Sequence, residues 1–442
     1  MKKIFYFLII QNNFMKVFTK EKLSHINIYA FLTIFFLISI VLCQFHLFYS
    51  LFLITLGVSY LLSYKLQKYS TLILHYVNPF LILYLQSWGI WILLTDRVVP
   101  PDLLKTFFII SVCSFYTFNF VFLFLFKEQT PLKIKNFNES FYKLVKIISF
   151  LALLIYILII FQSSGLGNKR QIKDFIFQNS YLGYLYAFSN LFIICLLYEL
   201  FKVYNKRKEF YKKLIFQATI FLFIYLVLGE RDLLFTYIIG YFFIISFKKG
   251  RFWLKKYYLF ILVLTLLGHY TQLFKSYMFQ DQAVDISDNS FYNNGFDDFM
   301  TTGLNIERVY RINKLQALDR NMILSDLGNV VGVSMNSGKW FNYVFLNRGI
   351  GYTGYGFSFP LLGYLDFKIF GVFILYFILA VISSKVFNYL NGNILGLSFI
   401  IFFISLIIYI QRQDLAYFLN LTIKFVLIPY FLMTFIKKKK IF

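Results

Sequence analysis

Residues 394–411 have the sequence ILGLSFIIFFISLIIYIQ, an apolar run of membrane-spanning length without a charged side chain. The polar residues Arg412, Gln413 and Asp414 follow, and a second apolar run then occupies residues 415–436. Because about 20 apolar residues in a helix cross the hydrocarbon core of a bilayer, we predict two antiparallel spanning helices joined by a short charged turn.

Runs of the same kind recur from Ile26 to Ile436, and of the 442 residues 59% are hydrophobic and only 14% are charged. The alternating pattern of outer-membrane barrels is absent, and in lipid only helices and closed barrels satisfy their backbone hydrogen bonds. The sequence therefore predicts an all-α, polytopic membrane protein with about 12 transmembrane helices.

The expected order is a cytoplasmic tail at 1–25, spans within 26–270, a long periplasmic loop at 271–368, spans within 369–436 and a basic tail at 437–442. Each short gap assigned to the cytoplasm contains lysine, as the positive-inside rule requires, so both termini are expected in the cytoplasm. The predicted spans are 26–43, 45–63, 71–94, 103–126, 147–162, 181–201, 214–229, 233–247, 257–270, 369–384, 394–411 and 415–436.

The remaining composition argues against several functional classes. The net charge of +24 follows the positive-inside pattern, so we expect no nucleic-acid partner. The three cysteines all fall inside apolar spans, which argues against disulfides and thiol metal sites. No two of the four histidines have the spacing of metal ligands, and no nucleotide-binding fingerprint is present. We therefore expect neither a metal nor a cofactor.

Arginine is distributed differently from lysine, because eight of the ten arginines fall in gaps assigned to the outer face. The planar guanidinium matches phosphate or carboxylate, whereas lysine is a hydrated point charge. The set indicates a site for an anionic, phosphate-bearing lipid, although any single member could instead end a helix and pair with an acid. The eight are Arg97, Arg170, Arg231, Arg308, Arg311, Arg320, Arg348 and Arg412.

The sequence Gly229-Glu230-Arg231-Asp232 joins two apolar stretches with almost no loop. Consecutive charges at a membrane edge are costly unless they pair or meet a ligand. We expect Glu230 or Asp232 to orient Arg231 toward a substrate, and a carboxylate here could accept a proton from an attacking hydroxyl. A charged turn between antiparallel helices is the alternative.

Two glycine-rich segments carry further candidates. Residues 163–168 are small or polar apart from Leu166 and precede Lys169 and Arg170, a pattern suited to an oxyanion but also common in plain turns. Arg348 precedes the segment 349–364, which we expect to be irregular backbone buried against the helices. There Tyr352 and Tyr355 could offer ring faces and hydroxyls to sugars, or the segment could simply pack on the bundle.

The long outer segment is predicted to contain a helix over Gly303–Asp319, with Arg308 and Arg311 on one face. Such a helix could lie over the membrane surface and close a cavity. In the last span, Lys424 is near mid-bilayer and is expected to face the bundle interior. Among the histidines, only His269 is placed to act as a base.

These segments resemble the Wzy-type oligosaccharide repeat-unit polymerases of O-antigen and capsule assembly. The resemblance is carried by Ser164 through Arg170 with Tyr181-Leu182-Gly183, by Gly229–Asp232, and by Gly351 through Gly371. One departure lies in the last motif: where many relatives carry a glutamate, this chain has Gly363 and Tyr364, and Asp366 is the nearest acid. The related ligases have a histidine in the large outer loop, and 271–368 has none.

The resemblance implies a GT-C-like architecture in the bacterial inner membrane. It implies glycosyl transfer at the periplasmic face between two polyprenyl-pyrophosphate-linked oligosaccharides, and a chain-length regulator protein as a further partner. From the placement of the residues, we predict that catalysis rests on Glu230, Arg231, Asp232, Arg348 and Arg412, and substrate binding on Lys169, Arg170, Arg308, Arg311, Tyr352 and Tyr355. The alternatives are a flippase for the lipid-linked unit and an O-antigen ligase, and the general base is unassigned.

Overall fold

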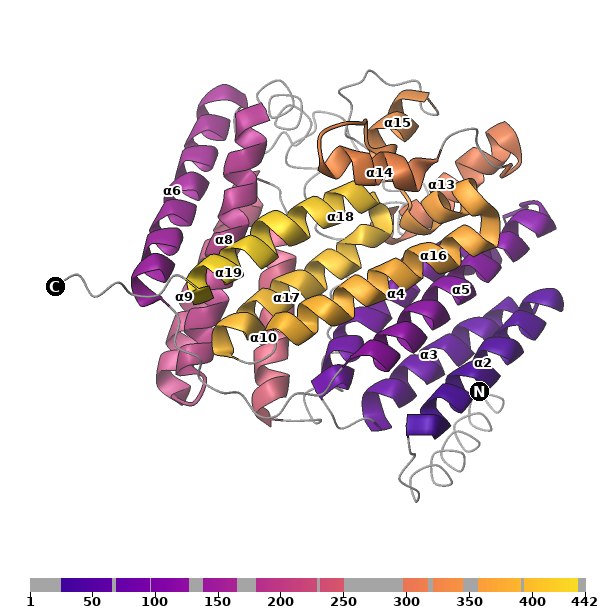
Figure 1. The fold of residues 1–442 in the computed structure, drawn as a ribbon, viewed down its shortest axis with the longest axis horizontal. Helices are drawn as coiled ribbons and strands as arrows, with labels where there is room; N and C mark the ends of the chain where they lie inside the picture. The colour runs from indigo at the N-terminus through magenta and orange to yellow at the C-terminus, as the bar shows by residue number, and fades with distance from the viewer. Residues whose placement is uncertain are drawn as a thin grey trace.

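The computed structural model describes residues 25–65, 69–95, 97–126, 138–164, 180–228, 231–249, 297–316, 321–344, 357–390 and 393–435. All regular structure within these ranges is helical, and no strand occurs among them. The helices pack side by side as a bundle (Figure 1). The all-α prediction is therefore confirmed for these ranges.

The described elements fall into three groups along the chain. The N-terminal group comprises α2 (His25–Gln44), α3 (Phe48–Lys65), α4 (Tyr69–Leu94), α5 (Pro101–Leu125), α6 (Glu139–Ser164), α8 (Ser180–Val203), α9 (Arg207–Leu228) and α10 (Arg231–Lys249). The middle group comprises α13 (Asp297–Asn313), α14 (Met322–Val330) and α15 (Ser337–Val344). The C-terminal group comprises α16 (Phe359–Leu390), α17 (Ile394–Tyr409), the 3-10 turn η1 (Ile410–Arg412), α18 (Leu415–Leu421), the π-helical η2 (Thr422–Leu427) and α19 (Ile428–Phe435).

Six described segments are long and apolar enough to cross a membrane, so the chain is a helical membrane protein. They are Ile73–Leu94, Pro101–Leu125, Glu139–Gln162, Phe359–Leu390, Ile394–Arg412 and Leu415–Phe435, and shorter apolar helices occupy Ile28–Gln44, Phe48–Leu62 and Leu233–Phe247. Every predicted span except 257–270 overlaps a described helix over most of its length, and that one lies outside the described residues.

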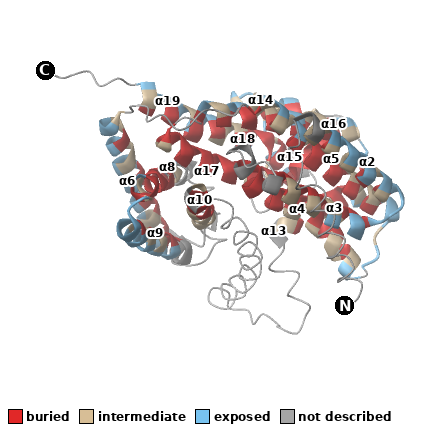
Figure 2. Cartoon of the chain, turned by 90° about the horizontal axis from the view of Figure 1, so that it is seen from below, coloured by how far each residue is buried: buried red, intermediate tan, exposed pale blue. Residues whose placement is uncertain are grey.

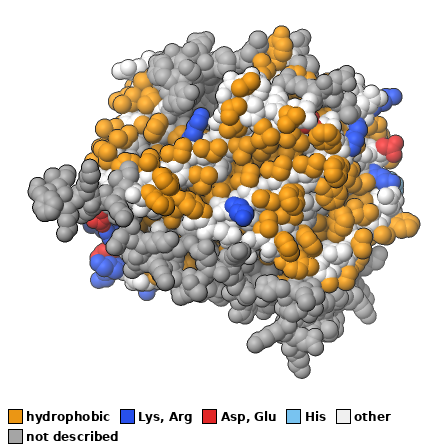
Figure 3. Space-filling view, in the orientation of Figure 1, with side chains coloured by type: hydrophobic (Ala, Val, Ile, Leu, Met, Phe, Trp, Pro, Cys, Tyr) orange, Lys and Arg blue, Asp and Glu red, His pale blue; other side chains and the backbone are white. Residues whose placement is uncertain are grey.

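The segments differ in how much of their surface the bundle covers. In the apolar stretch of the segment Ile394–Arg412, 89% is buried inside the bundle. In that of Glu139–Gln162, only 28% is buried. Exposed residues accordingly gather on α2, α6 and α9 at the periphery (Figure 2). Apolar side chains also cover most of the described part of the broad face in Figure 3. Such a surface is stable in lipid and would be unfavourable in water.

Contacts between helices show which helix ends lie together at each end of the bundle. At one end Arg97 forms an ion pair with Glu307 (2.8 Å). At the other, Asn388 near the end of α16 donates a hydrogen bond to the carbonyl of Leu125 at the end of α5 (3.3 Å). We call the first the arginine end and the second the lysine end. The arginine end carries Arg97, Arg308, Arg311 and Arg412, and the lysine end carries Lys146, Lys202, Lys206 and Lys213.

Helix α13 corrects the expectation of a helix lying over the membrane surface. It begins at Asp297 rather than at Gly303, and the ring of Phe299 lies 4.9 Å from that of Tyr84 and 6.4 Å from that of Phe80. Phe80 is about 20 Å along α4 from its last residue, at 1.5 Å per residue. Helix α13 thus enters the bundle beside α4 and emerges at the arginine end. Because α13 is rich in polar residues, its insertion into the bundle could not be predicted from the sequence.

Helix α16 begins at Phe359 rather than at residue 369, so part of the segment expected to be irregular is helical. It bends where Lys368 adopts a left-handed conformation (φ 54°). At this bend a Cβ on Gly371 would lie 1.9 Å from the carbonyl oxygen of Gly363, so neither position has room for a side chain. We call Gly363–Gly371 the α16 corner. The expected burial of the segment 349–364 is observed for its described residues 357–363.

Lys424 also departs from its expected position. It lies in the π-helical segment η2 and is exposed on the outside of the bundle rather than facing the interior. The neighbouring Ile423 is exposed as well, at 38%. A π-helical turn inserts one extra residue into the helical repeat and therefore shifts which residues face the bundle.

Candidate functional site

The candidate site lies at the arginine end, where the middle group of helices meets the C-terminal group. Figure 1 shows α13, α14 and α15 together at this end, beside the start of α16 and the turn between α17 and α18. The side chains that organise this region come from segments as far apart as residues 97 and 414.

The turn that carries Arg412 is held by its neighbour Gln411, which is fully buried. The main-chain carbonyl of Gln411 accepts a hydrogen bond from the hydroxyl of Thr302 on α13 (3.1 Å). The side-chain carbonyl accepts another from the hydroxyl of Tyr376 on α16. The guanidinium carbon of Arg412 lies 5.6 Å from the ring centroid of Tyr409, a cation–π distance. Arg412 therefore sits on a turn fixed by two other helices.

Asp326 on α14 and Asp414 before α18 form a buried acid pair next to this turn, with 0% and 5% of their surfaces exposed. Asp326 accepts hydrogen bonds from the backbone N–H and hydroxyl of Ser337 (2.6 and 2.9 Å) and from the backbone N–H of Leu415 (2.9 Å). Asp414 accepts one from the backbone N–H of Tyr417 (2.7 Å). The two acids thus join the starts of α15 and α18.

The environment of the acid pair favours protonation. Burial raises the pKa of Asp326 to about 6, against the opposing effect of its hydrogen bonds from Ser337 and Leu415. Burial, together with the negative charge of Asp326, raises the pKa of Asp414 to about 7, while its backbone hydrogen bonds and the charge of Lys339 oppose the shift. Asp414 is therefore the member that keeps a proton to higher pH.

Glu307 on α13 gathers two of the arginines. Its side chain is only 6% exposed and accepts from Arg97 at 2.8 Å and from Arg311 at 2.6 Å. Arg308, the next residue, donates a hydrogen bond to the side-chain carbonyl of Asn305 (3.0 Å). Arg97 thereby tethers the segment between α4 and α5 to α13.

Asp366, the acid nearest to the glutamate position of the resemblance, binds the start of α14. Its two carboxylate oxygens accept the backbone N–H groups of Met322 and Ile323, both at 2.8 Å. On the same α16 corner, Lys368 donates to the carbonyl of Leu315. A carboxylate at a helix N-terminus satisfies amides that have no partner within the helix. Asp366 thus has a structural role here.

The structure brings together three of the predicted site residues, Arg308, Arg311 and Arg412, at one end of the bundle. Arg231 and Asp232 begin α10, although their side chains are outside the description. Phe235, one turn later, has its ring 5.1 Å from that of Phe80, which also meets Phe299 of α13. The first turns of α10 and α13 therefore both border Phe80. The predicted residues Lys169, Arg170, Glu230, Arg348, Tyr352 and Tyr355 lie outside the described residues, as does His269.

The acid pair was not predicted from the sequence, and only half of it left a readable signal. Asp414 precedes an apolar run, which is typical of a helix N-cap. Asp326 lies within α14, and nothing local indicates that Leu415 would bind it. No group of three or more histidine, cysteine, aspartate or glutamate side chains in the described ranges is arranged to hold a metal ion.

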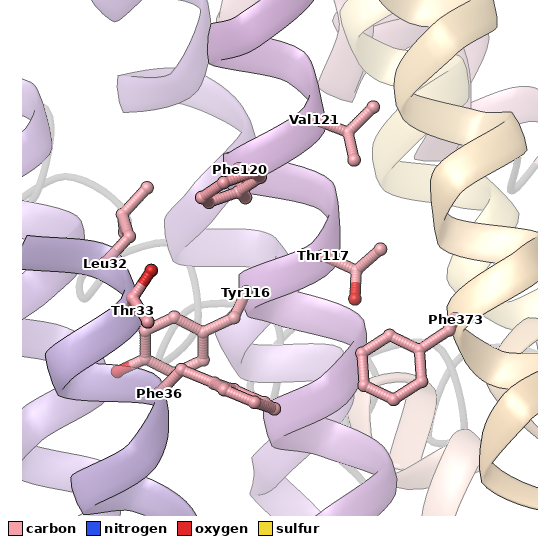
Figure 4. A pocket seen from close by; sticks show the side chains of 8 residues that line it. All are labelled: Leu32, Thr33, Phe36, Tyr116, Thr117, Phe120, Val121 and Phe373. Atoms are coloured by element: carbon pink, nitrogen blue, oxygen red, sulfur yellow. The ribbon is translucent and has the colours of Figure 1, made fainter. Parts of the chain in front are cut away.

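A separate cavity of about 310 Å³ opens between α2, α5 and α16. Figure 4 shows its walls, which are almost entirely apolar and carry no charged side chain. Tyr116, on one wall, is about 22 Å along α5 from Pro101 at the arginine end, at 1.5 Å per residue. The cavity is therefore not suited to a phosphate and is distinct from the arginine end. Its lining residues are Leu32, Thr33, Phe36, Tyr116, Thr117, Phe120, Val121 and Phe373.

No protein-family model, curated protein or solved structure matches this chain.

Proposed function

We propose that this protein polymerises polyprenyl-pyrophosphate-linked oligosaccharide repeat units at the periplasmic face of the bacterial inner membrane, with both termini in the cytoplasm. The arginine end is then periplasmic and the lysine end cytoplasmic. The observation that carries the proposal is the gathering of arginines at one end of a membrane-embedded helical bundle, with Arg412 on a turn held by α13 and α16.

In the proposed reaction, a hydroxyl of one repeat unit attacks the anomeric carbon at the lipid-linked end of the growing chain. A new C–O bond forms as the bond between that carbon and the pyrophosphate oxygen breaks. Polyprenyl pyrophosphate leaves with the electron pair, and the hydroxyl proton passes to a base. Negative charge therefore accumulates on the pyrophosphate, where preorganised guanidinium groups stabilise it most effectively.

The residues divide by role under this proposal. Arg231, Arg348 and Arg412 stabilise the departing pyrophosphate, and Glu230 and Asp232 orient Arg231 or receive the proton. Binding of the lipid-linked glycan falls to Lys169, Arg170, Arg308, Arg311, Tyr352 and Tyr355. The position of Arg311 beside Glu307 and of Arg308 beside Asn305 supports a binding role rather than a chemical one.

The test is complementation of a strain that lacks the gene, with the surface polysaccharide displayed on a gel. We expect Arg231→Ala to abolish the long-chain ladder and Arg231→Lys to restore little of it, since lysine lacks the planar fork. Arg207→Ala, at the start of α9 on the lysine end, is the matched control and should leave the ladder intact. An undiminished ladder with Arg231→Ala would refute the central role of that residue.

The deletion strain separates the alternatives. Surface glycan of a single repeat unit supports a polymerase. Complete loss of surface glycan with lipid-linked units trapped in the cytoplasmic leaflet identifies a flippase. Accumulation of finished lipid-linked polymer identifies a ligase.

A further inference from the structure

The α14–α15 hairpin and the turn before α18 are cross-connected through the acid pair. Asp326, on α14, binds the N–H groups at the starts of both α15 and α18. Asp414, at the start of α18, lies against α15 so closely that a Cβ on Gly338 would be 2.6 Å from its carboxylate oxygen. Asp326 and Asp414 therefore both contact α15 and α18. Separating α15 from α18 would break both sets of interactions at once.

If both buried acids were ionised, this connection would hold two negative charges away from water. Two ionised carboxylates cannot be held close together away from water without a large electrostatic cost, so one of them retains a proton. Asp326 accepts more hydrogen bonds and is the better place for the negative charge. The charged groups on the surrounding elements are Lys339 on α15, Arg412 on η1, Asp366 and Lys368 on α16, and Glu307, Arg308 and Arg311 on α13.

We infer that Asp326 and Asp414 are positioning residues that share one proton and latch α14 and α15 onto the turn carrying Arg412. Ionisation of the second carboxylate loosens this latch and separates α14 and α15 from the turn, which keeps its contacts with α13 and α16. The consequence for Arg412 in catalysis rests on the proposed function, whereas the latch itself is a property of the fold. The inference assigns no chemical step to either acid.

The direction of the pH dependence follows from the pKa shifts. Burial raises the pKa of both acids above the ordinary value of 3.8, to about 6 and about 7. A group whose pKa is raised in the closed state binds its proton more tightly there, so closure is favoured at low pH. The latch should therefore weaken as the pH rises through the range between 3.8 and about 7 and remain weak above it.

Hydrogen exchange of the full-length protein in detergent, corrected for the intrinsic effect of pH, measures the latch directly. In peptides covering α14, α15 and the start of α18, we expect protection to fall by about tenfold per pH unit approaching pH 7 and then to level off. Asp414→Asn, which is neutral at every pH, should flatten this dependence. In Asp326→Asn, the amide N–H group would face the donor groups of Ser337 and Leu415 and could not accept from them. This variant should therefore lower protection from exchange at every pH. Asp102→Asn, an exposed acid at the start of α5, is the matched control.

The activity of the same variants separates the latch from the proposed function. If polymer synthesis is observed, Asp414→Asn should retain it and lose the decline on the alkaline side of the pH profile. If the protein lacks polymerase activity but its hydrogen exchange follows the expected pattern, the latch is supported and the proposed function is refuted. Wild-type protection that is constant from pH 5 to 8, or an Asp414→Asn variant with unchanged pH dependence, would overturn the latch.

Discussion

The two ends of the bundle use charge in different ways. At the lysine end, ion pairs form between long side chains that stay partly exposed: Lys202 and Glu139 are 3.6 Å apart with 63% and 57% of their side chains exposed. At the arginine end, Glu307, Asp326 and Asp414 are nearly or fully buried and bind guanidinium or backbone N–H groups. Exposed pairs contribute little to stability, whereas a buried group that loses its partner is costly.

This difference teaches what each end requires. In the proposed orientation, positive charge at the lysine end serves only to orient the chain in the membrane, so its exposed side chains can move. At the arginine end, Asp326 and Asp414 hold α14, α15 and α18 in a defined arrangement beside the Arg412 turn. The proposed reaction, in which charge accumulates on pyrophosphate, would need such preorganisation.

The largest effect should come from Asp326→Ala. Removal of this carboxylate leaves the N–H groups of Ser337 and Leu415 buried without their acceptor, and we expect a loss of about 3–5 kcal/mol of unfolding free energy. The thermal unfolding midpoint in detergent measures it, with Asp102→Ala as the exposed-acid control. Equal midpoints for the two variants would show that the arginine end is not built as described.

A smaller loss is expected from Glu307→Gln, because its partners Arg97 and Arg311 are 37% and 67% exposed and can regain water. We expect a decrease of about 1–2 kcal/mol, reduced for this solvent screening. Arg97→Ala in the same background should add little further loss, since the two residues interact directly. Additive losses in this double-mutant cycle would contradict the pairing.

The smallest effect is expected at the lysine end. Glu199 lies near Lys146 and 3.5 Å from Lys213, with 23% of its side chain exposed. Glu199→Gln should lower the unfolding free energy by about 1 kcal/mol or less, and added salt should reduce the difference from wild type. A salt-independent loss as large as that of Asp326→Ala would erase the contrast between the two ends.

The spanning helices could be predicted because long apolar runs carry their own signal. The boundaries of α17 and of the turn at Arg412 agree with the sequence, since charge interrupts the apolar pattern there. The position of α13 was predicted wrongly because Thr302, Asn305 and Glu307 are polar. Their burial is stable only because they form contacts with other helices. The early start of α16 was missed because glycines that usually indicate irregular backbone here permit a close approach of two helical turns.

Composition and periodicity alone determined that this chain is a helical membrane protein, because transfer into lipid depends on the residues of each segment taken separately. The tertiary structure decided which polar groups meet: Arg97 with Glu307, Asp366 with the start of α14, and Asp326 with Leu415. The partners in these three contacts are separated by 210, 44 and 89 residues. Such contacts leave no local signal, because the burial that gives them their strength exists only after the helices have packed.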